Sequence, residues 1–499
     1  MTVGRRLGKF TVAKIVLCLV VPLSVAACTN PSRPELSHER PILRIAVSNA
    51  PALATERGVQ QFIINQTNEG LLRVNQEGHI ESWFAENWER SVDGLRISIH
   101  LRKPSAIFHD GSPADAAAIV AILNEQRTKS LKQWAADLDS ISAKGDSEIV
   151  VTFKRPSSFF IDALMDVPVA KPGTPTIGIG AFKPAPQGTN GGAQIVAHDS
   201  YYLGAPTLGG LTVRTYASPR AAWAEMLRDQ VDLLYEVGGD AIALMQGATN
   251  VSLYSFDRPY QYVLFLNPRS KKLKSTLIRQ GLNQAIDRPS LVREALSSHG
   301  TPSVGPISEH HWAFQKTVNS VFTYAPVDAV AKLPKGLELS CVTLAGQPYE
   351  QLALVLKQQL RNVGVQLAVQ EAPLEQIISK LSGDDVDAVL LDALSGWGLS
   401  RIYQRWHSMG SANAAKYENS AVDDDLDAIN HALTEDQYRA AVSAFQKQIA
   451  SDPPAVFLAW SERSRAVSTR FDVKPEPGRD VLATLRTWHP RADNVSTTH

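Results

Sequence analysis

Hydrophobic residues in the last third of the chain change their spacing twice, and this change predicts a strand, a helix and a second strand. Residues 337–344 alternate between apolar and polar, as in a strand, and residues 365–369 do so again. From 349 to 363 apolar side chains recur every three or four residues, and Gly364 follows as a helix stop. The alternation continues with a further helix and strand, at 374–381 and 386–391. The pattern predicts a mixed or parallel sheet covered by helices.

The first third of the chain carries the same mixture of elements. Residues 42–47 and 96–101 are expected to be strands, the second of them entered through the turn Asp93-Gly94. Residues 114–126 are expected to form a helix that Pro113 enters, with Ser112 as its N-cap. The expected fold class is therefore α/β from end to end.

The N-terminus has the features of a secretory signal. Residues 1–27 contain four basic residues and no acidic one, and the apolar run from Ile15 to Ala27 is shorter than the ~20 residues of a membrane-spanning helix. The segment Val25-Ala26-Ala27-Cys28 resembles the lipobox of bacterial lipoproteins, in which the cysteine is lipidated and becomes the first residue. A plain signal peptide with an incidental cysteine is the alternative. Residues 28–41, polar and with three prolines, are expected to form a flexible tether.

Charge and cysteine content narrow the class of protein. The chain of 499 residues has 50 basic and 50 acidic residues, and removal of 1–27 leaves 46 and 50. Because phosphate backbones are bound by clustered Lys and Arg, this balance argues against a nucleic-acid partner. Cys341 is the one cysteine of the body, and its apolar surroundings in sequence predict a buried thiol without a disulfide.

No catalytic or metal-binding motif stands out, so the chain is not expected to be an enzyme or to hold a cofactor or a metal. The Gly-x-Ser-x-Gly, His-Glu-x-x-His, Walker and Cys-x-x-Cys patterns are absent. The pair His310-His311 suits one metal badly, because adjacent side chains point apart, and solvent-facing loop histidines are expected instead. The acidic run 423–427 lacks the glycine and distal glutamate of a calcium loop and is expected to begin a solvated helix.

A series of segments resembles the signature of bacterial extracellular solute-binding proteins of family 5, the peptide, dipeptide and nickel receptors of ABC importers. The first segments are 68–74 (NEGLLRV), 80–88 (IESWFAENW), 93–94, 101–103 and 108–113 (FHDGSP). Others follow in the family's order at 178–182, 201–206, 230–232, 265–267, 279–288, 300–302, 305–306 and 362–365. The likeness spans roughly residues 42–470, and most of these residues are expected to be scaffold.

The resemblance implies a two-lobed, periplasmic-binding-protein-like fold of class II, of the large cluster C type. It has mixed sheets, an extra subdomain in the first lobe and a hinge between the lobes. Lobe 1 would comprise 42–260, with an inserted subdomain at about 83–185, and lobe 2 would comprise 261–465. Residues 466–499 would return to lobe 1 and end as a tail. The two chain crossings at 257–261 and 462–470 would be the hinges.

The resemblance also selects candidate ligand-binding residues. They are Asn49, Asn68, Glu69, Tyr260, Tyr262, Asn267, Asp392, Trp397, Arg401 and Arg405. Trp397 matches a family position that often faces the cleft, with buried packing as the alternative. Hydrogen bonding within the hinge is the alternative for the two tyrosines and Asn267.

One departure from the family concerns specificity. Peptide receptors place an aspartate for the α-ammonium group shortly after the tryptophan, whereas this chain has Arg401 and Arg405 there. Either arginine, facing the cleft, would favour an anionic group. The alternative is that both are surface residues paired with nearby acids.

The expected function is that of a substrate-binding lipoprotein of an ABC importer. It would be exported, anchored through Cys28 to the outer face or periplasmic side of the cell membrane, and monomeric. It would bind a small solute, above all peptides, and deliver it to permease and ATPase subunits. The alternatives are an anionic opine-like compound, a sugar or a metal chelate as the solute, or an envelope protein that senses or acts as a scaffold.

Overall fold

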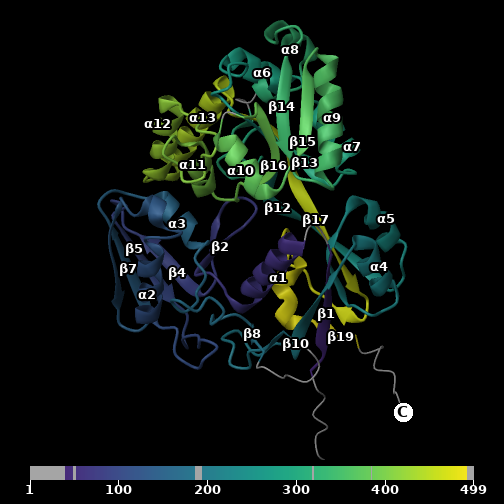
Figure 1. The fold of residues 1–499 in the computed structure, drawn as a ribbon. Helices are drawn as coiled ribbons and strands as arrows, with labels where there is room; N and C mark the ends of the chain where they lie inside the picture. The colour runs from purple at the N-terminus through teal and green to yellow at the C-terminus, as the bar shows by residue number, and fades with distance from the viewer. Residues whose placement is uncertain (1–39, 49–51, 186–193, 317–319, 384, 492–499) are drawn as a thin grey trace, which may run out of the picture. The chain divides into compact units, whose positions relative to one another are not determined.

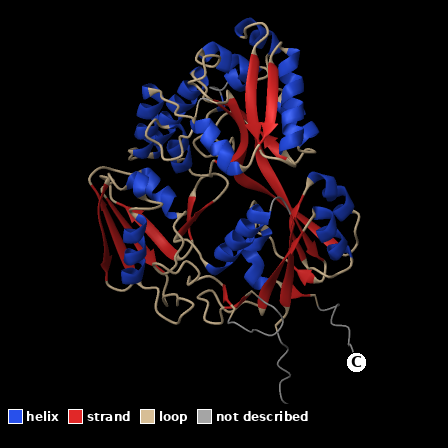
Figure 2. Cartoon of the chain, in the orientation of Figure 1, coloured by secondary structure: helices blue, strands red, loops and turns tan. Residues whose placement is uncertain are grey.

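The computed structural model describes residues 40–48, 52–185, 194–316, 320–383 and 385–491 (Figure 1). Within them the chain forms an 11-stranded mixed sheet, a separate four-stranded sheet and helices (Figure 2). The predicted signal and Cys28 lie outside the described residues. No helix in the described part of the chain is sufficiently long and hydrophobic to cross a bilayer.

The large sheet has the strand order β15-β14-β16-β12-β17-β11-β1-β10-β9-β8, and β13 also pairs with β17. Its strands are β1 Ile42–Ser48, β8 Phe182–Pro184, β9 Ile195–Ala197, β10 Gly210–Tyr216, β11 Leu233–Val237, β12 Val251–Leu266, β13 Gly300–Pro302, β14 Glu338–Thr343, β15 Gln366–Glu371, β16 Ala388–Leu394 and β17 Ala455–Ser468. The predicted strand at 42–47 is β1.

Two long antiparallel strands, β12 and β17, connect the two parts of this sheet (Figure 1). The first half of β12 pairs with the last residues of β17, up to Asp257 opposite Glu462. The register then shifts between Asp257 and Gln261, and the second half of β12 pairs with the start of β17 and with β16. The bulge lies in the first of the two segments that the resemblance predicts as hinges. Because a bulge bends its strand and leaves residues outside the ladder, it re-aims the side chains there.

The elements predicted for the last third are present. β14 pairs in parallel with β15 and with β16, and α9 (Tyr349–Asn362) lies beside them. Three leucines of α9 are fully buried, and each contributes roughly 1.5–3 kcal/mol by leaving water. Gly364 follows the helix with φ +82°, a backbone conformation that favours glycine. Cys341 of β14 is buried with a free thiol, as predicted, and burial raises its pKa to about 12.

Helices cover this part of the sheet and continue beyond it. They are α6 Thr276–Gln284, α7 Arg288–Ala295, α8 Pro326–Lys332, α10 Leu374–Ser382, α11 Ser400–Trp406, α12 Ser420–Asn430 and α13 Glu435–Ser451. The acidic run begins α12, with Asn419 as the N-cap and Asp423 in the first turn. This agrees with the expected helix start.

Around β1 and β11 the sheet is covered by α1 (Ala52–Thr67), α4 (Pro219–Leu227) and α5 (Gly239–Gln246). The chain returns here after β17 through β18 (Phe471–Asp472), a 3₁₀ helix at Val481–Thr487 and β19 (His489–Pro490). Trp488 and Leu485 are buried against Leu43 and Leu211 in one apolar core. This core fixes the C-terminal segment on the first part of the sheet.

The separate sheet has the order β4-β5-β7-β6. Its strands are β4 Ala85–Arg90, β5 Arg96–Leu101, β6 Leu138–Lys144 and β7 Glu148–Phe153, and it is accompanied by α2 (Ala116–Gln126), α3 (Ser158–Leu164) and the hairpin β2 Leu72–Val74 with β3 Ile80–Ser82. The expected strand 96–101 is β5.

The predicted N-cap of α2 was wrong. Asp115, not Ser112, accepts the hydrogen bond from Ala118 N–H, at 2.9 Å. The hydroxyl of Ser112 instead donates to Asp110 within the preceding turn. Both residue types cap helices, so the tertiary position of the turn decides which one does.

Candidate ligand-binding site

Two adjoining cavities form the candidate site. Their volumes are about 440 and 480 Å³, and both have Val74, Arg479, Asp480 and Ala483 in their walls. We call them the first and the second cavity. Both volumes lie within the ~300–1,000 Å³ typical of pockets for small molecules.

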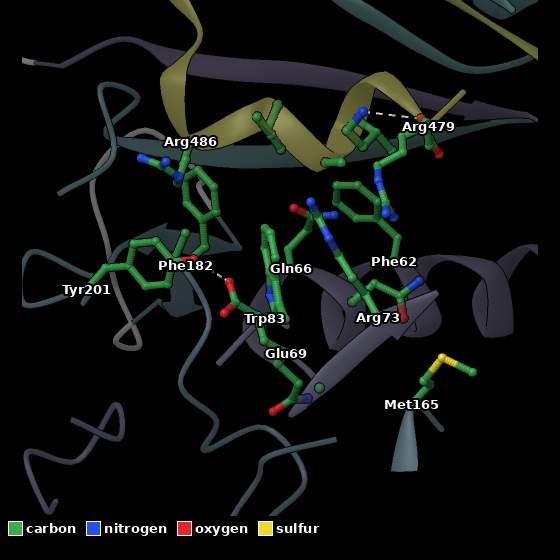
Figure 3. Close-up of a pocket in the computed structure, with 18 of the residues that line it drawn as sticks. Phe62, Gln66, Glu69, Arg73, Trp83, Met165, Phe182, Tyr201, Arg479 and Arg486 are labelled. Carbon is green, nitrogen blue, oxygen red and sulfur yellow. Dashed lines mark hydrogen bonds between the residues drawn. The ribbon is translucent and has the colours of Figure 1, made fainter. Parts of the chain in front are cut away.

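The first cavity lies between α1, the residues that follow it and the C-terminal segment (Figure 3). Phe62 and Gln66 come from α1, and Arg479 and Arg486 come from the opposite wall. Trp83 lies between these two walls. The cavity therefore combines aromatic surface with fixed charges.

Glu69 is held in the wall of the first cavity by two phenols. The hydroxyl of Tyr201 donates to one of its carboxylate oxygens (Figure 3), and that of Tyr202 donates to the other. The side chain of Trp83 also bonds to it. Burial raises the pKa of Glu69, while these hydrogen bonds and the nearby Arg486 act against that rise. Its hydrogen-bonding capacity is thus largely used within the protein.

Four charged residues form a network where the cavities meet. Arg73 Nε lies 2.9 Å from Glu81 Oε2 and its Nη1 lies 3.2 Å from Glu476 Oε2. Arg479 contacts the same two carboxylates at 2.6 and 3.3 Å. Arg73 also stacks over Trp83, 4.3 Å from the ring centre. The two arginines are therefore neutralised locally and held in fixed orientations.

A buried ion pair positions the C-terminal segment. Arg465 of β17 is 3% exposed and donates to both carboxylate oxygens of Asp480, at 2.6 and 3.2 Å. Its guanidinium lies 4.0 Å from the ring centre of Tyr235. Asp480 also caps the 3₁₀ helix by accepting from Leu482 N–H. Through Asp480, β17 fixes a wall that both cavities share.

The second cavity is lined by the bulge of β12, the loop of Trp397, the β2–β3 turn and the C-terminal segment. Trp397 stacks on Trp460 of β17, with ring centres 5.8 Å apart. Its loop is tied to the bulge because Ser395 and Gly396 N–H both donate to the Pro259 carbonyl, at 2.9 and 3.0 Å. Gly78 of the turn lies close by, since a Cβ there would meet the Trp397 carbonyl at 2.9 Å. Four segments distant in sequence thus converge on this cavity.

Three of the predicted candidates line the cavities. Asn68 and Glu69 belong to the first, and Trp397 belongs to the second. Asn68 donates to the Pro175 carbonyl at 2.8 Å, and its buried Oδ1 has no hydrogen-bond partner among the described residues. Asn49 lies outside the described residues.

The candidates near the hinge form a packed cluster that belongs to the lining of neither cavity. Tyr262 is 9% exposed and packs edge-on against Tyr349, whose hydroxyl donates to Asp392. Arg258 stacks on Tyr260 and lies 4.0 Å from the Asp392 carboxylate. Tyr260 and Tyr262 are thus held in the hinge region by ring contacts.

Asn267 is fully buried, and its side-chain amide forms hydrogen bonds within the protein. Its Nδ2 donates to the carbonyls of Gly383 and Val386, both at 3.1 Å, and its Oδ1 accepts from Arg269 N–H. The residue thereby ties the end of β12 to the segment before β16. It does not line either of the two cavities.

Neither arginine after Trp397 lines the two cavities. Arg401 Nη2 pairs with Asp166 Oδ2 at 2.7 Å, as the alternative held. Arg405 donates to the Leu394 carbonyl at 3.0 Å, and its Nε is buried without a partner in the described part of the chain. Burial, with Arg401 nearby, lowers the pKa of Arg405 to about 10.

The expectation of solvent-facing histidines holds for one residue of the pair. His310 is exposed, but His311 is 4% exposed and stacks on Trp312, and burial lowers its pKa to about 3. The close approach of Gly78 to His311 explains the burial, because the β2–β3 turn covers the ring. Within the described ranges no set of three or more His, Cys, Asp or Glu is arranged to hold a metal ion.

Several lining residues were not among the predicted candidates. Asp257 and Pro259 lie in the predicted hinge, but their direction into a cavity depends on the bulge. Arg73 lies inside a quoted family segment, whereas Arg479 and Asp480 lie in a stretch without periodicity. The expected return of the C-terminal segment was the one signal that could have placed these last two residues near the site.

The sheet order, the long strands β12 and β17 and the cavities beside their bulge define the two-lobed, periplasmic-binding-protein-like class of solute-binding folds. The sequence profile described as "Bacterial extracellular solute-binding proteins, family 5 Middle" matches residues 79–415. The chain belongs to this family, whose members bind solutes and are not enzymes.

The similarity to individual proteins of this family is low in sequence identity. The chain is 22% identical over 481 residues to the oligopeptide-binding protein AppA of Bacillus subtilis (strain 168), covering 85% of this chain and 87% of AppA. It is 23% identical to the glutathione-binding protein GsiB of Pectobacterium atrosepticum, covering 84% and 88%. The crystal structure of NikZ from Campylobacter jejuni in complex with Ni(L-His) is similar with a TM-score of 0.76 and 20% identity, covering 90% and 99%. The structural likeness confirms the fold.

Proposed function

We propose that this protein is the substrate-binding lipoprotein of an ABC importer, and that it captures a peptide or a related small solute in the two adjoining cavities. The observation that carries the proposal is the convergence of lobe-spanning segments on one site. Trp397 enters from the second part of the sheet, and Arg479 and Asp480 enter from the segment that returns to the first part. A solute that contacts both walls would stabilise the closed arrangement over an open one.

The peptide assignment is supported by the two relatives and by the walls of the site. The relatives are named for binding an oligopeptide and glutathione, which is itself a tripeptide derivative. Aromatic side chains at Phe62, Trp83 and Trp397 offer apolar surface to varied side chains, whereas the charged residues offer partners for backbone and terminal groups.

A thermal-shift screen of di- to pentapeptides tests the peptide assignment. A solute that binds only the folded protein raises its melting temperature by mass action. We expect several peptides at millimolar concentration to raise it by a few degrees. If no peptide shifts the transition, the assignment to peptides is wrong, although the assignment to the family stands.

A metal chelate is the second candidate solute, because a structural neighbour holds Ni(L-His). The same screen with nickel(II) and L-histidine, together and singly, separates the two candidates. A shift with the chelate and none with peptides would favour the second candidate.

We further propose that the protein is exported, monomeric and anchored through a lipid on Cys28. The basic start, the apolar run and the Val25-Ala26-Ala27-Cys28 segment support export and the lipid anchor. Radioactive palmitate fed to expressing bacteria should label the wild type and not Cys28→Ala. Equal labelling of both proteins, or of neither, would contradict the anchor.

A further inference from the structure

The second cavity is acidic, and two of its carboxylates have no Lys or Arg partner in the described part of the chain. Four of its five charged lining residues are acids, namely Glu77, Glu81, Asp257 and Asp480. Glu81 pairs with two arginines and Asp480 with Arg465. By contrast, within the described part of the chain no Lys or Arg pairs with Asp257 or Glu77. An acidic wall of this kind attracts a cation.

Of these two carboxylates, Asp257 is the more buried. It is half-buried, whereas the side chain of Glu77 is 66% exposed at the turn. Burial raises the pKa of Asp257, and the Glu462 carboxylate adds to the rise. The exposed His310 acts in the opposite direction, and no hydrogen bond compensates the carboxylate. In the described part of the chain, a negative charge on Asp257 is therefore opposed by burial and by Glu462 and offset only by His310.

The repulsion between Asp257 and Glu462 follows from the pairing of their strands. Asp257 and Glu462 are direct partners on the antiparallel strands β12 and β17, and like charges opposite each other destabilise such a pair. His299 is engaged with the other member of this pair, because its Nδ1 lies 2.9 Å from the Glu462 carboxylate. The basic residues Arg258 and Arg463 are engaged with Asp392 and Glu236.

The bulge directs this carboxylate at the candidate site. Phe256, Asp257 and Pro259 all line the second cavity, and Pro259 holds the loop that presents Trp397 to the same cavity. A carboxylate next to an aromatic face is a suitable environment for an ammonium or guanidinium group, which gains from both.

We propose that Asp257 binds a cationic group of the solute, an ammonium or a guanidinium, in the second cavity beside Trp397. This inference rests on the proposed function, because it places the solute in the same cavity. It assigns the recognition of positive charge to the hinge strand and not to the segment after Trp397, where Arg401 and Arg405 stand. The bound cation would also offset the repulsion between Asp257 and Glu462.

The test compares trialanine with N-acetyl-trialanine, which lacks the cationic amino group, by titration calorimetry. In the wild type we expect acetylation to weaken binding about ten-fold or more, the range of a charge-assisted hydrogen bond. In Asp257→Asn, the two peptides should bind with nearly equal affinity. Asp199→Asn is the control: it removes an exposed carboxylate that lines neither cavity, and it should retain the wild-type ratio.

The melting temperature of each variant without solute shows whether a loss of binding is caused by a loss of folding. Asp257→Asn should melt at the wild-type temperature or above it, because the repulsion from Glu462 is removed. If trialanine binds the wild type and the ratio between the two peptides is the same in Asp257→Asn, the assignment of Asp257 is overturned.

If neither peptide binds the wild type, the peptide assignment is wrong, and the same proteins are titrated with putrescine as a plain diamine. Binding that Asp257→Asn weakens about ten-fold or more supports the cation site without the peptide. An absence of binding to wild type, or unchanged binding by the variant, overturns the cation site as well.

Discussion

Asp162 is a single carboxyl group buried where two helices meet. Its side chain is 7% exposed, and it accepts a hydrogen bond from Ser400 N–H, at the start of α11, at 3.2 Å. Gly398 permits this approach, because a Cβ there would lie 2.6 Å from Asp162 Oδ2. Burial raises the pKa of Asp162 to about 7, and the nearby Asp166 carboxylate adds to the rise.

This pKa makes stability depend on pH. An unfolded aspartate titrates near 3.8, so between that pH and about 7 the folded protein keeps a proton that the unfolded chain has released. The free energy of unfolding therefore falls as the pH rises, by about 4 kcal/mol in all at ~1.4 kcal/mol per pKa unit. We expect the melting temperature of Asp162→Asn, relative to that of the wild type, to increase as the pH rises from 5 to 8. The exposed Asp199→Asn serves as the control, and a pH-independent difference for Asp162→Asn would disprove the account.

At the scale of elements, the sequence was informative wherever one periodicity persisted. The apolar positions of α9 bury Leu352, Leu356 and Leu360, and the alternating run before it became β14. The N-cap of α2 was missed because Ser112 and Asp115 are both good caps and only the tertiary turn selects between them. The bulge in β12 was not predicted either, because it depends on pairing with β16 and β17 and not on local residue preference.

The candidate site was harder to predict than its scaffold, because its contacts join distant parts of the chain. Arg73 pairs with Glu476 across 403 residues, and Arg465 reaches Asp480 beside the same cavities. Asn68 and Glu69 lie in a family segment, and Trp397 matches a single family position. Their partners lie in a C-terminal stretch whose sequence has no periodic pattern, and only the fold brings it to the cavities.

At the scale of the whole molecule, the central claim is that the protein holds a small solute in these cavities and leaves it chemically unchanged. Mass spectrometry under non-denaturing conditions, on protein purified from bacteria grown in peptide-rich medium, tests this most directly. We expect a mass above that of the chain, and denaturation should release an intact solute of peptide size, with less of it from Asp257→Asn. The account would be contradicted if the protein had the mass of the chain alone and also failed to bind any added solute. It would also be contradicted if the released solute were covalently altered.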